Sequence, residues 1–262
     1  MNILEQIVES KKKSLTEKED WYGIKKLEAS SFFERECESL VKRLNNESTT
    51  GIIAEFKRRS PSKGIINDKA KLEDVANAYE NYGAAGISVL TDEEYFGGSN
   101  ADLMKAREIV DIPLLRKDFI VDEYQVVETK SIGADIMLLI AACLSPKEVK
   151  KLAAIAKSLG LEVLLELHDE KELEHICDQT ELIGINNRDL KTFEVDINRS
   201  LRMAERIPND KIKIAESGIS SVENIKLFME NGFKGFLIGE NFMKEPDPGM
   251  AFKEFVNKLN HQ

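Results

Sequence analysis

The amino-acid sequence predicts an α/β protein, a single (β/α)8 (TIM) barrel with an N-terminal helical extension, and three observations indicate this fold class. From residue 51 onward, short runs rich in leucine and β-branched residues alternate with longer charged segments of helical period, which is typical of a parallel sheet wrapped by helices. We count eight such pairs. The chain has 262 residues, close to the roughly 250 residues that one closed barrel of this class needs.

The expected strands are apolar on both faces, as parallel strands must be when core covers one side and helices cover the other. This pattern favours closure into a barrel. An open, doubly wound sheet is the alternative fold, but the G-x-G-x-x-G motif that would indicate it after the first strand is absent. In chain order, the expected strands are residues 51–56, 85–90, 113–118, 135–140, 162–167, 182–187, 211–216 and 235–240.

The segments between the strands carry helix start and stop signals. Ser145, Pro146 and Glu148 form a capping start. Glycines stand where four helices must end before the next strand, at Gly83, Gly133, Gly160 and Gly232. Residues 1–50 contain two further amphipathic segments, around 2–13 and 30–46, with no strand between them. We therefore expect residues 1–50 to be a helical extension packed on a catalytic barrel of residues 51–262, the two forming one structural domain.

Composition and charge exclude several classes of protein. The formal net charge of -10 repels nucleic acid and anionic lipid, so we expect neither as a partner. The N-terminus has no export signal, and the most apolar stretch, residues 136–146, is about half the length of a membrane-spanning helix. The three cysteines, Cys37, Cys143 and Cys177, are odd in number and widely spaced, which indicates reduced thiols in a cytoplasmic protein.

Polar residues gather where the expected strands end, and the active site of such a barrel lies at the carboxyl ends of its strands. Any one of these side chains could belong to an ion pair that holds the rim of the barrel. Lysines and acids that meet as a set would instead perturb one another's pKa values, as acid–base catalysis requires. The set comprises Glu55, Lys57, Lys117, Glu166, Asn186, Arg188, Glu216 and Ser217.

The last two strands predict a phosphate site. Gly218 and Gly239 allow the chain to pass close to a ligand, and a helical turn that opens at Glu240 would direct backbone N–H groups at an anion. The alternative is that both glycines only shape tight turns. Arg188 and the basic run 57–64 supply local positive charge in an acidic protein, so we infer a phosphorylated small-molecule substrate.

We expect no metal and no cofactor. The three histidines have no metal-ligand spacing, and the sequence lacks a G-x-x-x-x-G-K-[ST] nucleotide loop. His168, at the end of the fifth expected strand, is interpreted as a hydrogen-bonding residue of the barrel rim.

Six segments closely resemble the indole-3-glycerol-phosphate synthase family, and the resemblance extends through essentially the whole chain. It implies that the substrate is 1-(2-carboxyphenylamino)-1-deoxyribulose 5-phosphate and that a carboxy-lyase reaction yields indole-3-glycerol phosphate, carbon dioxide and water. The segments are residues 52–64, 113–125, 163–173, 183–196, 214–220 and 236–243.

The resemblance also implies roles for individual residues. Lys117 matches the family's general acid and Glu166 its general base, with Glu55 and Lys57 as an accompanying acid–base pair. Two further residues assist, Asn186 by orienting the substrate and Glu216 by positioning the active-site lysines.

The resemblance implies that the phosphate is held by Ser60, Arg188, Ser217, Gly218, Gly239 and Glu240. Glu240 would act through its backbone N–H, and because the family can have serine here, its acidic side chain is expected to point away from the anion. The anthranilate ring would lie against Phe119, Leu138 and Phe193.

Two other functions stay open at this point. A phosphoribosylanthranilate isomerase would want a cysteine in the first strand and an aspartate in the sixth, whereas the first strand offers Glu55 and Lys57. A phosphate-binding barrel without turnover should lack part of the proton-transfer set. The family resemblance leaves association with other tryptophan-pathway enzymes open, because no sequence feature shows whether they dock here. We expect a monomer, although no sequence feature decides the oligomeric state.

Overall fold

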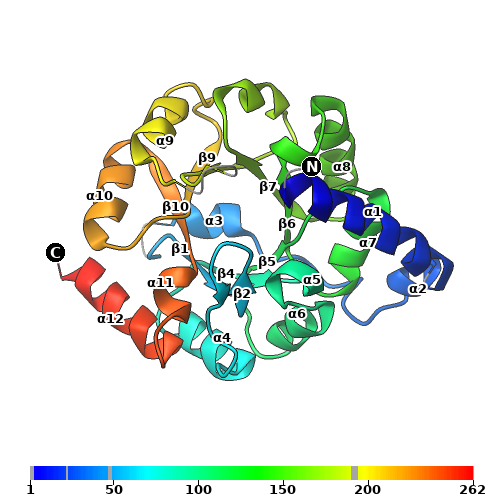
Figure 1. Ribbon diagram of the computed structural model, residues 1–262, viewed down its shortest axis with the longest axis horizontal. Coiled ribbons are helices and arrows are strands. Elements are labelled where there is room, and N and C mark those ends of the chain that lie inside the picture. The colour runs from blue at the N-terminus through cyan, green and yellow to red at the C-terminus, as the bar shows by residue number, and fades with distance from the viewer. Residues whose placement is uncertain (1–2, 22, 47–48, 190–193, 262) are drawn as a thin grey trace.

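The computed structural model describes residues 3–21, 23–46, 49–189 and 194–261. Their parallel strands form the predicted closed barrel in the order β1-β10-β9-β8-β7-β6-β5-β4, seen end-on in Figure 1. Each strand overlaps one expected segment. The barrel strands are β1 (Ile52–Phe56), β4 (Gly86–Leu90), β5 (Leu114–Lys117), β6 (Ile136–Ile140), β7 (Glu162–Leu167), β8 (Leu182–Asn186), β9 (Ile212–Glu216) and β10 (Phe233–Ile238).

Helices surround the barrel in chain order (Figure 1). After β7 the connection is only the 3₁₀ helix η2 (Glu170–His175), where we expected a longer helical segment. The other helices around the barrel are α4 (Leu72–Asn81), α5 (Glu93–Phe96), α6 (Asn100–Arg107), α7 (Glu123–Ser131), the 3₁₀ helix η1 (Ala141–Cys143), α8 (Pro146–Ser158), α9 (Ile197–Ala204), α10 (Val222–Glu230), α11 (Glu240–Met243) and α12 (Pro248–Asn260).

The local signals in the sequence have the predicted geometry. Ser145 accepts a hydrogen bond from the backbone N–H of Glu148, whose side chain accepts one from the Ser145 backbone, so α8 begins with a full capping box. The glycines that follow α4, α7, α8 and α10 have φ angles of 90°, 89°, 78° and 79°. Only glycine adopts this left-handed region without steric cost.

The N-terminal extension comprises α1 (Ile3–Trp21), α2 (Ile24–Glu28) and α3 (Leu40–Leu44). The expected helix over 30–46 is therefore wrong for most of its length, since only 40–44 are helical. Residues before α3 instead bind acids at the amino ends of the barrel strands: Arg35 and the backbone N–H of Glu38 bind Asp135. These contacts to a distant part of the chain outweigh the local helical period.

The core has two layers. One lies between the strands and the surrounding helices. The other fills the barrel interior with inward side chains such as Ile53, Leu115 and Ile214, and Leu40 and Leu44 of α3 pack into it from the extension. No helix of the described residues is long and apolar enough to cross a membrane.

Beyond β1, the chain forms a small antiparallel hairpin of β2 (Arg59–Ser60) and β3 (Gly64–Ile65). In Figure 1 this hairpin projects over the middle of the barrel. It carries the predicted phosphate ligand Ser60 to the carboxyl ends of the strands, where α1 also lies.

Candidate active site

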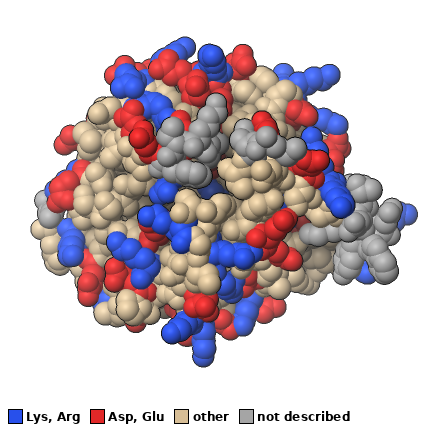
Figure 2. Space-filling view, in the orientation of Figure 1, with Lys and Arg blue, Asp and Glu red and all other residues tan. Residues whose placement is uncertain are grey.

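A cavity of about 450 Å³ opens at the carboxyl ends of the barrel strands, where Figure 2 shows Lys and Arg side chains around the middle of the face. It brings together every predicted site residue that the structure describes. Phe193 lies outside the described residues. The predicted residues that line it are Glu55, Lys57, Ser60, Lys117, Phe119, Leu138, Glu166, Asn186, Arg188, Glu216, Ser217, Gly218, Gly239 and Glu240.

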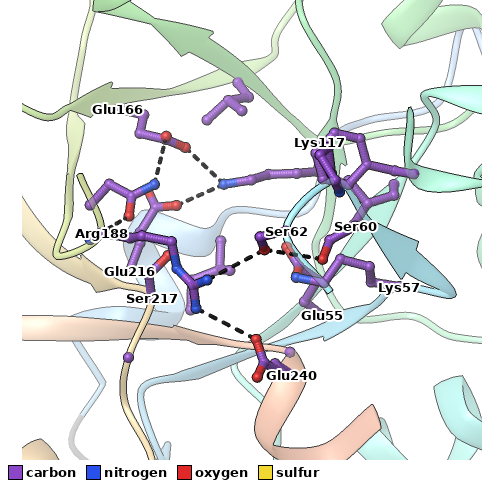
Figure 3. A pocket seen from close by; sticks show the side chains of 18 of the residues that line it. Glu55, Lys57, Ser60, Ser62, Lys117, Glu166, Arg188, Glu216, Ser217 and Glu240 are labelled. Atoms are coloured by element: carbon purple, nitrogen blue, oxygen red, sulfur yellow. Dashed lines mark hydrogen bonds and ion pairs between the residues drawn. The ribbon is translucent and has the colours of Figure 1, made fainter. Parts of the chain in front are cut away.

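Lys117 joins two buried carboxylates at the inner end of the cavity (Figure 3). Its Nζ lies 2.9 Å from Glu166 Oε2 and 2.7 Å from Glu216 Oε2. Asn186 Nδ2 donates a 3.0 Å hydrogen bond to the other oxygen of Glu166. These four side chains come from β5, β7, β8 and β9, so closure of the barrel assembles a cluster that is scattered in the sequence.

The surroundings separate the pKa values of the three charged groups. Burial lowers the pKa of the Lys117 ammonium, but the neighbouring carboxylates outweigh burial and raise it above its ordinary value. Burial raises the pKa of Glu166, but Lys117 and His168 hold it well below its ordinary value. For Glu216, burial and the charge of Glu166 outweigh Lys117 and raise the pKa to about 7. The cluster thus offers a charged ammonium, an ionised carboxylate and a carboxyl that changes protonation near neutral pH.

Two glycines make room for the acids. A Cβ at Gly184, in β8, would lie 2.0 Å from Glu216 Oε1, and a Cβ at Gly239 would lie 2.5 Å from Glu55 Oε1. Gly239 therefore has a packing role against Glu55, besides any close approach to a ligand. Within the described residues Glu216 Oε1 has no hydrogen-bond partner. An unpartnered buried carboxylate oxygen is costly in free energy and is typical of functional sites.

A second acid–base pair lies on β1 and just beyond it. Lys57 Nζ is 2.5 Å from Glu55 Oε1, and the Glu55 side chain is buried. Figure 3 shows this pair on the side of the cavity nearer Ser60, away from Glu166. A substrate between the two pairs would meet an ammonium from each side.

The cavity's other end has the features expected of an anion site. Ser217 and Gly218 have φ angles of 65° and 70°, and Ser217 is the one non-glycine residue with positive φ in the described chain. Arg188 Nη1 donates to Ser62 Oγ at 3.4 Å. Consecutive left-handed residues beside an arginine suit a phosphate or carboxylate.

The orientation of Glu240 differs from the expectation. Its carboxylate does not turn away from the cations: Oε2 lies 3.5 Å from Arg188 Nη2 and Oε1 lies 3.6 Å from Lys63 Nζ, as Figure 3 shows for Arg188. The side chain is 38% exposed. It is attracted by the same positive charge that would attract a phosphate, so a bound anion would compete with Glu240 for Arg188.

Sequence reasoning missed several residues of the cavity wall. His168 was interpreted as a rim residue, yet it lines the cavity with Nε2 3.0 Å from Glu166 Oε1. Ile3, Leu4 and Ile7 of α1 also line it. The spacing of Ile3 and Ile7 is an i, i+4 apolar pattern, but nothing in that pattern says which surface of the barrel the helix covers.

Comparison with known proteins gives one consistent result. Residues 4–255 match the family model described as indole-3-glycerol phosphate synthase. The indole-3-glycerol phosphate synthase of Bacteroides thetaiotaomicron is 45% identical over 258 residues, which cover 98% of this chain and 99% of the relative. That of Chromobacterium violaceum is 48% identical over 201 residues, 76% of each chain.

Solved structures support the fold. A variant of the tryptophan synthase alpha-subunit from Pyrococcus furiosus is similar with a TM-score of 0.61 over 80% of this chain and 98% of that one, at 16% identity. At this identity the likeness supports the barrel fold alone. Taken with the family match and the curated relatives, the chain belongs to the indole-3-glycerol phosphate synthase family.

Proposed function

We propose that this cavity closes the indole ring, converting 1-(2-carboxyphenylamino)-1-deoxyribulose 5-phosphate to indole-3-glycerol phosphate, carbon dioxide and water. The observation that carries the proposal is the contact of one buried ammonium, Lys117, with two buried carboxylates of different acidity, Glu166 and Glu216. Pairs of acids with separated pKa values are the usual basis for assigning proton donors and acceptors.

Lys117 is the proposed general acid of ring closure. As the anthranilate ring carbon attacks the ribulose carbonyl, negative charge develops on the carbonyl oxygen. A charged ammonium can stabilise that oxygen and then donate a proton to it. The raised pKa of Lys117 keeps the group charged at neutral pH, which is the state a donor must start from.

Glu166 is the proposed general base. After the carboxylate leaves as carbon dioxide, a hydroxyl must depart as water and a ring proton must be removed to make the indole aromatic. Glu166 is held ionised by Lys117 and His168, so it is ready to accept that proton. Glu55 and Lys57 are the second acid–base pair, 2.5 Å apart, and are proposed to serve the departing hydroxyl.

The other residues of the cavity are proposed to hold the substrate. Arg188, Ser60 and the backbone of 217–218 suit the phosphate, with Gly239 and Glu240 beside them. Phe119 and Leu138 form apolar wall for the anthranilate ring, and Phe193 remains a proposal from the sequence. A cavity of about 450 Å³ is within the usual range for a small organic ligand.

We also propose that residues 1–50 and the barrel work as one structural domain, because α1 supplies part of the cavity wall and α3 packs into the barrel interior. We propose that the protein acts as a cytoplasmic monomer. Its three cysteines are free thiols, in keeping with a reducing compartment.

The decisive experiment is to incubate the protein with the carboxyphenylamino-deoxyribulose phosphate and follow indole fluorescence and release of carbon dioxide. We expect both signals to rise together. A folded wild-type protein that yields neither would overturn the proposal. Isomerisation of phosphoribosylanthranilate without indole formation would assign the cavity to a neighbouring reaction.

A further inference from the structure

His168 is a buried histidine in contact with the proposed base. It is the residue after β7, its side chain is 8% exposed, and it lines the cavity. Nε2 lies 3.0 Å from Glu166 Oε1, and Nδ1 lies 3.8 Å from Glu172 Oε2. The ring therefore stands between a carboxylate of the cavity and a carboxylate of η2.

The two contacts favour the doubly protonated ring. A neutral imidazole has one N–H and one lone pair, so one ring nitrogen would present its lone pair to a carboxylate. An imidazolium has an N–H on each side and is attracted by both acids. Within the described residues neither ring nitrogen has a well-aligned hydrogen bond, so the attraction to Glu166 and Glu172 is mainly electrostatic.

The groups facing His168 from neighbouring elements are mostly acidic. Glu166 is on β7, Glu172 on η2 and Glu216 on β9, and all three act on the charge of the ring. Lys117 of β5 opposes them from the far side of Glu166. Cys143 of η1 is also close to Glu166 and Glu172, but burial and these acids raise the pKa of its thiol to about 12, so it stays neutral.

Glu172 is fixed independently of the histidine ring. Its Oε2 accepts hydrogen bonds from the backbone N–H groups of His168, at 2.6 Å, and Asp169, at 3.3 Å, as part of the capping box of η2. The cap therefore holds the Glu172 carboxyl group beside the ring, 3.8 Å from Nδ1. Glu172 therefore both caps the start of η2 and lies next to the imidazole of His168.

We propose that His168 is a positioning residue for the proposed reaction, an imidazolium held between Glu172 and Glu166 that orients the Glu166 carboxylate and keeps it ionised. Asn186 donates to the same oxygen, Oε1, and Lys117 takes the other, so each oxygen of the base has a polar partner. The proposal rests on the role of Glu166 given above.

Removing the histidine should weaken the base in acid. Burial raises the pKa of Glu166, and Lys117 and His168 oppose it. Loss of one nearby opposite charge moves a carboxyl pKa upward by roughly one unit or more. In His168→Asn we expect the acid limb of the kcat/KM profile to move up by about that amount, with a smaller change near pH 8.

The test combines ¹H NMR titration of the histidine Cε1 protons with pH–rate profiles. The chain has three histidines, so His168→Asn assigns the resonance. In the wild type we expect His168 to titrate above the ordinary value of about 6.5. In Glu166→Gln we expect its pKa to fall by roughly one unit or more, and in Glu172→Gln, which keeps an acceptor oxygen for the cap, by less.

His175→Asn is the matched control, because His175 is also buried and in η2 but contacts the backbone oxygens of Leu144 and Glu172. It should leave the acid limb in place. The proposal is overturned if His168 titrates at or below 6.5, if Glu166→Gln does not move it, or if His175→Asn shifts the acid limb equally. The NMR result does not need turnover, so a wild type that makes no indole would overturn the proposed function separately.

Discussion

The barrel carries a buried group of charged side chains at each end, and the two groups are built differently. At the amino ends of the strands, Asp135 Oδ1 accepts from Arg35 and the backbone N–H of Glu38, and Oδ2 accepts from Arg107 and the backbone N–H of Leu114. At the carboxyl ends, Glu216 has one oxygen on Lys117 and one with no partner in the described chain.

The difference separates structure from chemistry. Because Asp135 has two donors on each oxygen, it fixes the parts of the chain that it joins, here the N-terminal extension and β5. A carboxyl short of donors has a raised pKa and can exchange a proton. Glu162 likewise joins the extension to the barrel, since it accepts hydrogen bonds from Ser39 and from the backbone N–H groups of Leu40 and Val41, although burial outweighs these donors and raises its pKa.

Replacing Lys117 by Met should have the largest effect. The change keeps the side-chain bulk and removes the proposed acid, so we expect kcat to fall roughly a hundredfold or more. Substrate binding, measured by isothermal titration calorimetry, should be largely retained. Activity near the wild-type level would show that the proton comes from elsewhere.

Asp135→Asn tests the opposite end. It leaves Arg107, whose side chain is 4% exposed, without its buried counter-charge, and breaking such a pair costs about 3 kcal/mol or more of unfolding free energy. Thermal unfolding should show a lower Tm, while kcat of the folded fraction stays within about twofold of wild type. An unchanged Tm would mean that the pairing contributes little to stability.

Much of the fold could be predicted because it depends on local patterns. Strand positions follow from apolar runs, and the end of α7 follows from Gly133, whose φ of 89° suits only glycine. The path of residues 30–39 could not be predicted, because it depends on Asp135, about a hundred residues away. Helical period says nothing about such a distant partner.

The site divides in the same way. That Lys117 and Glu166 should meet was predictable, because both stand at the carboxyl ends of barrel strands. It was not predictable that Glu216 would be the acid with an unpartnered oxygen, since this depends on Gly184 lying next to Glu216 Oε1. The orientation of the Glu240 side chain likewise depends on the positive charges of Arg188 and Lys63. These two residues lie beyond β8 and in the β2–β3 hairpin, and only the fold brings them together.

Arg188→Ala should mainly weaken binding. A cation that grips the phosphate contributes equally to the reactant and the transition state, so we expect KM to rise roughly tenfold to a hundredfold with a smaller change in kcat. Arg206→Ala is a suitable control, because Arg206 is exposed, pairs with Glu170 and does not line the cavity. A pure kcat defect in Arg188→Ala would contradict a phosphate role.

Glu216→Gln should stabilise the protein, and only at higher pH. The folded-state pKa of about 7 lies above the ordinary value of 4.5, so the neutral carboxyl favours folding below pH 4.5 and that advantage is lost as pH rises through 7. Glutamine does not ionise. Unfolding free energies should therefore be similar at pH 4 and higher in the variant by roughly 1–3 kcal/mol at pH 8, with catalysis impaired. A variant less stable than wild type at pH 8 would refute the sign.

Lys11→Met should have the smallest effect. Lys11 Nζ lies 2.9 Å from Asp92 Oδ2 and 2.8 Å from Asp118 Oδ1, and so ties α1 to the catalytic end. Because Ile3 and Ile7 line the cavity, loosening α1 should raise KM a few-fold. Lys13→Met, at an exposed position of the same helix, should leave KM unchanged. If both variants changed KM equally, the ion pairs of Lys11 would have no specific role in holding α1.

The division of roles between the two ends is tested most directly by the rate of indole formation in a single turnover, with folded enzyme in excess, for Lys117→Met and Asp135→Asn side by side. We expect the Lys117 variant to be slower by roughly a hundredfold or more and the Asp135 variant to match wild type. Equal rates for the two variants, or a slower Asp135 variant, would contradict the assignment of the chemistry to the carboxyl ends of the strands.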